Sequence, residues 1–295
     1  MNIQWILTGL FSFFWGGFVT PIAIRLARNY QIMDLPDHRK IHKVRTPRGA
    51  GLGLWLGCLL LSLYFVSDFA AIKYIATGAT LVFFCGYMDD MKSMSPFLRL
   101  GLHLCAATLV LWPLRLPVLT GVVCLFWITG MTSAYNLVDG VNGLCISIFI
   151  ASGVALCFID EDAVVFGIAE AAMALGVLCW NFPMARTFLG DGGSTLLGFL
   201  FASCFTTFCA PVFVRVGLHE LILLFLLFGG VPVLDTLIAF SRRILMGKSP
   251  FYPDRGHLHH HLLELTRSPM GAVTCLLLLH GLLLAAGVAV YARCV

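Results

Sequence analysis

Long apolar segments are the feature that most limits what this chain can fold into. Runs of about twenty residues with few charged side chains recur along the whole sequence, beginning with 3–24. A helix of this length crosses a bilayer and satisfies its own backbone hydrogen bonds there. Only 12% of the 295 residues are charged, whereas about one quarter are charged in an ordinary globular protein. The sequence therefore predicts an all-α polytopic membrane protein, with residues 1–295 forming one domain.

Ten segments are candidate membrane spans. They cover roughly 3–24, 49–67, 71–88, 97–112, 117–134, 143–159, 163–180, 193–214, 219–240 and 270–291. Only two connecting loops are long, 25–48 and 241–269. The first apolar run has no basic segment before it, so we expect a span and not a cleaved signal peptide. The eleven cysteines form no C-x-x-C pair, and we expect them to be small buried apolar residues, not metal ligands or disulfides.

Basic residues predict the orientation of the spans. Of the 19 lysines and arginines, 15 fall in or beside loops that follow odd-numbered spans. Cytoplasmic loops carry such an excess, so we expect these loops in the cytoplasm and both termini on the other side. A net charge of +4 divided among many loops does not suggest nucleic acid as a partner.

Five polar motifs fall on this same predicted side. They are "MDLPDHRKIHKVRTPRGAG", "MDDMKS", "YNLVDGVNG", "NFPMARTFLGDGGS" and "YPDRGHLHHHLLE". The loops on the other side, such as "IDEDA", look like plain solvated turns. The gathering of polar motifs predicts one site, at which a soluble cytoplasmic substrate meets a component of the membrane.

Four acids stand at or near predicted membrane boundaries: Asp89, Asp90, Asp139 and Asp191. Removing a carboxylate from water is costly, and acids that are close together repel one another and tend to bind protons. A divalent cation relieves both effects. Oxygen ligands without a nearby thiolate suit Mg²⁺ or Mn²⁺ better than Zn²⁺. Any one of these acids alone is best explained as a helix cap or a loop charge, but four on one face favour a metal site.

Two motifs have a spacing that suits ligands. Asn136, Asp139 and Asn142 are spaced i, i+3 and i+6, which places them on roughly one face of a helix; an Asx-rich turn is the alternative. Asp191 and the glycines after it precede a predicted helix. Amides at a helix N-terminus attract anions such as phosphate. A simple Gly-Ser cap is the alternative, but Asp191 in the same turn favours a metal together with a phosphate.

The histidine motif supplies phosphate-binding groups. Arg255 offers a bidentate grip, and the histidines at 257 and 259–261 can bind phosphate oxygens, stabilise a leaving phosphate or bind metal. The zinc-protease pattern H-E-x-x-H is absent. A surface histidine tract is the alternative interpretation.

The long basic loop and two intramembrane acids allow more than one interpretation. The loop that contains Lys40 and His42 either sets topology and attracts anionic headgroups or receives a phosphate at the membrane surface. Glu170 and Asp235 fall inside predicted spans. Such acids are functional candidates, but Asp235 is close enough to its span's end to pair with the arginines that follow, and neither acid receives a role.

Together these motifs predict a metal-assisted phosphoryl-transfer site. One substrate is expected to be a soluble phosphate ester and the other a lipid phosphate. A phosphate monoester is largely ionised at neutral pH, so it needs alignment and charge neutralisation more than a strong base.

At these motifs the sequence resembles the polyprenyl-phosphate N-acetylhexosamine-1-phosphate transferases of glycosyltransferase family 4. It looks most like the branch that starts bacterial O-antigen, common-antigen or teichoic-acid linkage synthesis. The matching motifs are "DLPDHRKIH", "GYMDDMKSMSPFLRL", "YNLVDGVNGL", "FLGDGGSTLLG" and "DRGHLHHHLLE". They occur in the family's order, from Asp34 to Glu264, and so cover most of the chain.

The resemblance implies a reaction and a location. An oxygen of polyprenyl (undecaprenyl) phosphate attacks the β-phosphorus of a UDP-N-acetylhexosamine, and UMP leaves. UDP-GlcNAc is the default donor, with UDP-FucNAc or UDP-QuiNAc as alternatives. Direct attack and a covalent aspartyl intermediate both stay open. The resemblance also implies Mg²⁺ as cofactor and a bacterial inner-membrane location with the site facing the cytoplasm. It is compatible with a homodimer.

The resemblance also implies roles for individual residues. The metal ligands would be Asn136 and Asp191, with Asp139 supporting the metal or the nucleotide. Two further acids would position or deprotonate the acceptor, or help to hold the metal: Asp89 and Asp90. The diphosphate would be bound by His257, His259 and His260. Uridine would be held by Asn181 and by Phe188, whose ring would stack on uracil. The full set of expected substrate-binding residues is Asn181, Phe188, Arg255, Asn142, Lys40 and His42.

The chain departs from the family's pattern in two respects, and two rival functions fit its motifs less well. Many bacterial members have aspartate where this chain has Asn142, and eleven spans are usual. A CDP-alcohol phosphatidyltransferase needs a D-G-x-x-A-R pattern, which "VDGVNGL" lacks. A transporter with intramembrane carboxylates predicts an inverted repeat and charges at the middle of the membrane, but the acids here cluster at one boundary.

Overall fold

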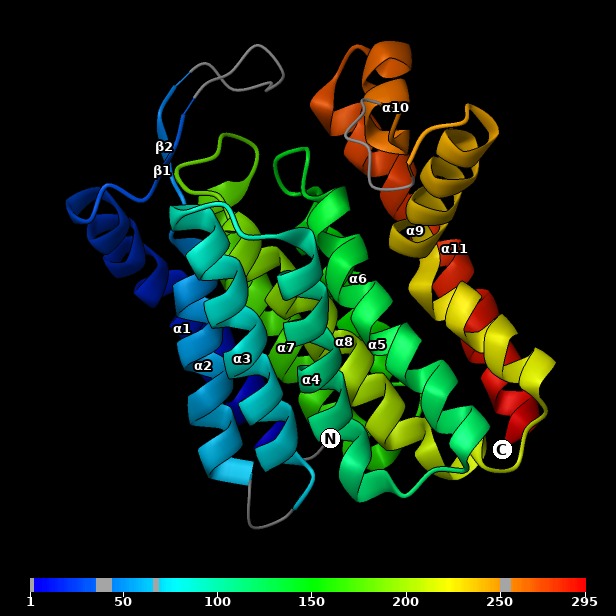
Figure 1. The fold of residues 1–295 in the computed structure, drawn as a ribbon. Coiled ribbons are helices and arrows are strands. Elements are labelled where there is room, and N and C mark those ends of the chain that lie inside the picture. Colours follow the sequence, from blue (N-terminus) through cyan, green and yellow to red (C-terminus); the bar gives the residue numbers. More distant parts are fainter. Residues whose placement is uncertain (1–2, 36–43, 66–68, 250–255) are drawn as a thin grey trace.

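The structure is a computed structural model that describes residues 3–35, 44–65, 69–249 and 256–295 (Figure 1). Almost all regular structure in these residues is helical. The helices are α1 (Ile3–Asn29), α2 (Ala50–Phe65), α3 (Ile72–Met91), α4 (Pro96–Leu111), α5 (Val118–Val138), α6 (Leu144–Leu156), α7 (Glu161–Asn181), α8 (Gly190–Phe213), α9 (Leu218–Leu245), α10 (Leu258–Thr266) and α11 (Pro269–Cys294). A short 3₁₀ turn follows α4, and two-residue strands β1 (Met33–Asp34) and β2 (Thr46–Pro47) pair antiparallel.

The all-α membrane bundle predicted from the sequence is confirmed. Each of the ten predicted spans coincides with a helix, and α10 is an additional short helix inside the predicted loop 241–269. Within the described residues, seven helices are long and apolar enough to cross a membrane: α1, α4 with the turn after it, α5, α7, α8, α9 and α11. The apolar helices α2 and α6 are shorter, with 16 and 13 residues.

Helix α8 is the central helix of the bundle. In its most apolar stretch 83% of the residues are buried, and it packs against α2, α3 and α5. Small residues make this possible: a Cβ added to Gly86 of α3 would lie 2.6 Å from the Asp191 carbonyl oxygen and the Gly192 nitrogen. Close approach at glycine is typical of helix contacts in membranes. The N-terminus of α8 is therefore held between neighbouring helices at one end of the bundle.

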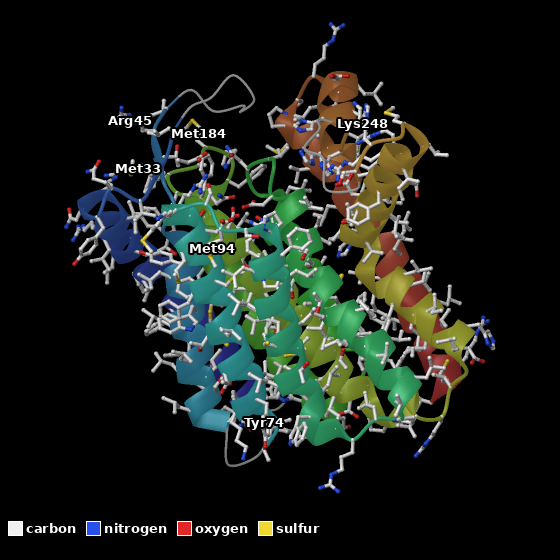
Figure 2. All side chains as sticks on the ribbon, viewed as in Figure 1. Met33, Arg45, Tyr74, Met94, Met184 and Lys248 are labelled. Carbon is white, nitrogen blue, oxygen red and sulfur yellow. The ribbon has the colours of Figure 1, made fainter. Side chains whose placement is uncertain are left out.

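The loops that carry the polar motifs lie at that same end. Figure 2 shows Met33, Arg45, Met94, Met184 and Lys248 there, whereas Tyr74 lies at the opposite end. Both chain termini are also at the opposite end (Figure 1). The structure therefore gathers five motif-bearing segments that are far apart in the sequence.

Helix α9 is broken at Gly230, which has φ 50° and ψ −136°. A buried histidine of α11 covers the break: Val231 N–H donates to His280 Nδ1 at 3.3 Å. His280 Nε2 lies 3.0 Å from Ser152 Oγ, which lies 3.0 Å from the Tyr135 hydroxyl. The second half of α9, which leads to α10, thus takes its direction from contacts with α11.

Candidate active site

A cavity of about 550 Å³ lies at the end of the bundle that carries the motif loops. This volume is within the range of small-molecule sites, about 300–1,000 Å³. One side is formed by the ends of α5 and α8 and presents what we call the acidic wall: Asn136, Asp139 and Asp191. The other side comes from the start of α10 and presents the histidine wall: His257, His259 and His260. Segments that are far apart in the sequence therefore line one cavity.

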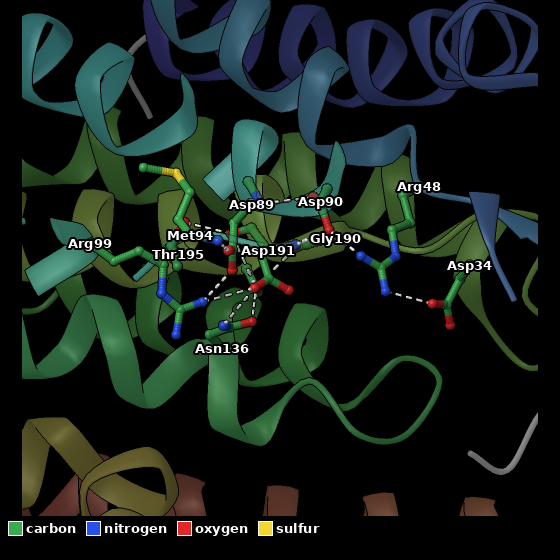
Figure 3. Close-up of polar contacts among 12 residues, drawn as sticks. Asp34, Arg48, Asp89, Asp90, Met94, Arg99, Asn136, Gly190, Asp191 and Thr195 are labelled. Atoms are coloured by element: carbon green, nitrogen blue, oxygen red, sulfur yellow. Dashed lines mark hydrogen bonds and ion pairs between the residues drawn. The ribbon is translucent and has the colours of Figure 1, made fainter. Parts of the chain in front are cut away.

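Asp191 lies in the first turn of α8, where four elements meet (Figure 3). Asn136 Nδ2 donates to Asp191 Oδ2 at 3.3 Å, and Arg99 Nη1 donates to the same oxygen at 3.2 Å. Arg99 also pairs with Asp89, which accepts a further bond from Met94 N–H at 2.5 Å. The Asn136 side chain is fixed from its other end, because Ser194 Oγ donates to its Oδ1 at 2.8 Å.

Asp90 is buried and caps helix α8. Its carboxylate accepts from Asp191 N–H at 3.0 Å and from Gly192 N–H at 3.2 Å, and only 2% of its side chain is exposed. A carboxylate on these free amides also interacts favourably with the helix dipole. Arg48 offsets the buried charge at 2.5 Å and pairs with Asp34 at the same distance. Arg48 and Asp34 are among the described residues that line the cavity. Asp89 and Asp90 are not among them and lie behind the cavity surface.

The expected nucleotide-binding residues also line the cavity. Asn181 joins two loops, since its Oδ1 accepts from Gly143 N–H at 2.7 Å and its Nδ2 donates to Thr187 O at 2.9 Å. Asn142 Nδ2 donates to Pro183 O at 3.4 Å. Phe188 is half-buried, and its backbone N–H donates to Pro47 O at 2.9 Å. Their positions beside one another suit a binding surface, with Asn181 also holding that surface together.

The histidine wall is organised by an acid on α9. His257 Nδ1 lies 2.8 Å from Asp235 Oδ2, and Leu258 N–H donates to Asp235 Oδ1 at 2.7 Å. The His257 and His259 rings stack with centroids 5.7 Å apart, and His260 follows at 4.2 Å from His259. The three rings therefore form one continuous aromatic surface.

The two walls differ in their protonation. Burial, reinforced by the negative charges of Asp191 and Asp90, raises the pKa of the Asp139 carboxyl to about 7. Burial also lowers the pKa of His259 to about 4, with the neighbouring His260 acting in the same direction. Each shift disfavours the charged form of a group that has been removed from water. At neutral pH the His259 ring is uncharged, whereas Asp139 is close to its midpoint.

The donor set of the acidic wall suits a magnesium-type ion. It consists of carboxylate and amide oxygens. Burial and the negative charges of Asp191 and Asp90 raise the pKa of Asp139, and a bound cation would offset both effects. Within the described residues, no group of three or more histidines, cysteines, aspartates and glutamates has the arrangement of a metal cage. Mg²⁺ rarely uses such a cage, because it keeps several waters and binds through one or two carboxylates plus substrate phosphates. The oxygens present fit that mode.

The structure also brings in residues that sequence reasoning did not select. The sequence marks Arg48 and Arg99 only as part of the basic excess that predicts topology, although each pairs with two acids from different elements. The sequence assigns Asp235 no role and offers the arginines after its span as partners; in the structure its carboxylate contacts the start of the histidine motif. A cation beside a glycine-rich helix start is the signal that could have indicated Arg48. The expected residues Lys40, His42 and Arg255 lie outside the described residues.

Comparison with known proteins agrees with the motifs. The chain is 29% identical to the probable undecaprenyl-phosphate N-acetylglucosaminyl 1-phosphate transferase of Bacillus subtilis, over 83% of this chain and 73% of the relative. It is 29% identical to the undecaprenyl-phosphate alpha-N-acetylglucosaminyl 1-phosphate transferase of Thermotoga maritima, over 82% and 77%. The Escherichia coli K12 protein of the same name is 26% identical over 96% and 81%.

A family model matches residues 72–209, which include the acidic wall and the helices that support it. The relatives extend the similarity on both sides of this segment. Over this segment the chain is similar to glycosyl transferase family 4, and its relatives are similar to it over most of its length.

Proposed function

We propose that this protein transfers N-acetylglucosamine 1-phosphate from UDP-N-acetylglucosamine to undecaprenyl phosphate and releases UMP. The observation that carries the proposal is the single cavity that has an acidic wall on one side and a histidine wall on the other. The names of the relatives give the reaction class and the lipid acceptor, and they favour a transferase over a transporter.

The reaction joins two anions, so the main task of the site is charge neutralisation and alignment. On the acidic wall, Asp191 and Asn136 would hold a Mg²⁺ ion, with Asp139 close by; when bound, this ion offsets charge on the diphosphate. The histidines of the other wall bind diphosphate oxygens, and the motif match assigns the same role to Arg255, which lies outside the described residues. The acceptor phosphate is already largely ionised at neutral pH and requires no strong base.

Asp89 and Asp90 act through their neighbours in this proposal. Asp90 fixes the first turn of α8, and Asp89 fixes Arg99, which contacts Asp191. Both therefore set the position of the proposed metal ligand. Asn181 and Phe188 hold the uridine, with the Phe188 ring stacking on the base.

We propose that the cavity end faces the cytoplasm of the bacterial inner membrane. The basic residues near this end support the orientation, because cytoplasmic loops carry the excess of lysine and arginine. They include Arg45, Arg48, Lys92, Arg99, Arg186, Arg242, Arg243 and Lys248. A soluble UDP-sugar would then reach the cavity from the cytosol and the lipid phosphate from the inner leaflet.

The test is UMP release by the purified protein in mixed micelles. We expect release only when UDP-N-acetylglucosamine, undecaprenyl phosphate and Mg²⁺ are all present, and none after chelation by EDTA. The Asp191→Asn variant should be slower by about 10²–10³-fold, since an interaction with a catalytic metal contributes several kcal/mol. Asp162→Asn, an exposed acid at the opposite end of α7, should keep full activity.

Two outcomes would overturn the proposal. Full activity of Asp191→Asn would remove the acidic wall from the reaction. Movement of a solute across proteoliposomes without UMP release would favour transport. A panel that includes UDP-FucNAc and UDP-QuiNAc identifies the preferred donor, and a strong preference for either would correct the sugar while leaving the reaction class intact.

A further inference from the structure

Asp235 is a buried acid with two separate tasks. It lies on the half of α9 that follows the break at Gly230, and the residue is 2% exposed. Its Oδ1 accepts from Leu258 N–H at 2.7 Å, at the first residue of α10. Its Oδ2 lies 2.8 Å from His257 Nδ1. One oxygen therefore caps a helix, and the other contacts a side chain of the cavity.

The second contact determines which His257 nitrogen carries a proton. An ionised carboxylate only accepts hydrogen bonds, so Nδ1 must be the protonated nitrogen. Any bond between a ring nitrogen and a ligand must then be made by Nε2. Arg243 Nη2 lies 3.4 Å from Nε2, which agrees with an acceptor at that position. His257 is 7% exposed and lines the cavity, so the ring is held in one orientation at the cavity surface.

The same contact favours a charged ring when an anion arrives. A buried cation is costly unless a partner offsets its charge. The Asp235 carboxylate supplies that partner at 2.8 Å, whereas the Arg243 guanidinium, 3.4 Å from Nε2, opposes a charge on the ring, so the charged ring forms only together with the arriving anion. A His257 ring protonated on both nitrogens can donate from Nε2 to an anionic oxygen, which makes a charge-assisted hydrogen bond. A neutral ring without the carboxylate makes only the weaker bond.

We propose that Asp235 is the positioning residue of His257: it fixes the ring so that Nε2 meets the diphosphate, and it stabilises the positive charge of the ring in that contact. The proposal rests on the proposed function, in which the cavity binds the diphosphate of a UDP-sugar. Asp235 itself touches no substrate.

The Asp235→Asn variant separates the two tasks. Its amide oxygen can still accept from Leu258 N–H, and asparagine is as good a helix cap as aspartate. Its amide nitrogen then faces His257 Nδ1, and because that nitrogen donates, it forces the ring proton to Nε2 and removes the charge. We expect kcat to fall about 10- to 100-fold, the range for losing a hydrogen bond to a charged group. The melting midpoint should stay that of the wild type.

Two further variants make the assignment falsifiable. His257→Ala should reduce kcat by a similar factor, and Asp235→Asn combined with His257→Ala should be no slower than His257→Ala alone, since both changes remove one interaction. Asp162→Asn is the matched aspartate-to-asparagine control. Multiplication of the two single effects in the double variant would overturn the proposal, as would an unchanged kcat in Asp235→Asn.

Binding of UDP, measured as the rise in melting midpoint on adding the nucleotide with Mg²⁺, gives a readout independent of turnover. We expect a smaller rise for Asp235→Asn and His257→Ala than for the wild type. If the wild type binds UDP but does not turn over any UDP-sugar, the proposed function fails, and the positioning claim is still judged by these rises. Equal rises in all three proteins overturn the positioning claim alone.

Discussion

The two walls of the cavity are held in different ways. The acidic wall stands on the ends of α5 and α8, inside the best-buried part of the bundle, where backbone packs on backbone at Gly86 and Gly192. The histidine wall stands on α10, a nine-residue helix reached through the half of α9 beyond Gly230. It is held by hydrogen bonds from His257 and Leu258 to Asp235 and by side-chain packing of α10 on α11. One wall is therefore fixed by close main-chain packing and the other by side-chain contacts.

This difference predicts different responses to mutation. Packed backbone cannot yield without moving a helix, so an added methyl group there should disturb both stability and chemistry. A side chain can change its rotamer without moving a helix, so a methyl group added against the histidine wall should lower activity and leave stability nearly unchanged. Glycines on each wall provide the matched changes.

The largest effect is expected for Gly86→Ala on the acidic side. The new Cβ would lie 2.6 Å from backbone atoms of Asp191 and Gly192, which forces α3 and α8 apart. Overpacking of this kind costs about 1–3 kcal/mol, and the displaced Asp191 should leave less than about 1% of the wild-type UMP release, since a small misplacement can cost ~10²-fold. Thermal unfolding and the UMP assay measure the two losses.

Gly130→Ala is the control for that change. Gly130 lies on α5, as Asn136 does, but an added Cβ would meet nothing within 4 Å. This variant should keep its activity and its melting midpoint. If Gly86→Ala were as active and as stable as Gly130→Ala, the close α3–α8 contact would not position the acidic wall.

A smaller effect is expected for Gly140→Ala on the histidine side. Here the new Cβ would lie 2.3 Å from His259 Nε2, at the far end of a side chain that can rotate. We expect the ring to move and UMP release to fall about tenfold, which corresponds to ~1.4 kcal/mol. The melting midpoint should change little. A loss of stability equal to that of Gly86→Ala would contradict the distinction between the two walls.

The sequence predicted the acidic wall better than its supports. Apolar runs predicted ten helices that the structure contains, because burial in lipid imposes one simple pattern. Among the described residues, seven helices are long and apolar enough to cross a membrane. The acidic wall is indicated by two local patterns. These are the spacing of Asn136 and Asp139 near a helix end and the glycines that follow Asp191. Arg48 pairs with Asp90, 42 residues away, and Arg99 with Asp191, 92 residues away, and no local pattern encodes such pairs.

The histidine wall illustrates the same limit more strongly. Its histidines are recognisable as a cluster, but their support is Asp235, which is 22 residues from His257. An isolated acid near the end of an apolar segment has many explanations. Only the break at Gly230 and the direction that it gives to α9 bring this acid to His257, and a single glycine followed by Pro232 does not specify that direction.

The smallest effects are expected from pH, where the two walls should oppose each other. The pKa of Asp139 is raised to about 7 in the folded chain, so between its ordinary value near 4 and pH 7 the folded state binds more protons than the unfolded state. Its contribution to stability therefore falls as pH rises through this window. The pKa of His259 is lowered to about 4. Between pH 4 and 6.5 the unfolded state binds more protons, so the contribution of His259 rises with pH.

Melting midpoints measured in EDTA at pH 5 and pH 6.5 separate these contributions. Asp139→Asn removes a contribution to stability that falls as pH rises, so the melting midpoint of this variant should rise more with pH than that of the wild type. His259→Asn removes a contribution to stability that rises with pH, so its melting midpoint should rise less. Each group contributes at most ~1.4 kcal/mol per pH unit, so differences of a few degrees are expected. Burial raises the pKa of an acid and lowers the pKa of a histidine, so the two variants should change the pH dependence of the melting midpoint in opposite directions. A change in the same direction in both variants would contradict this difference between the walls.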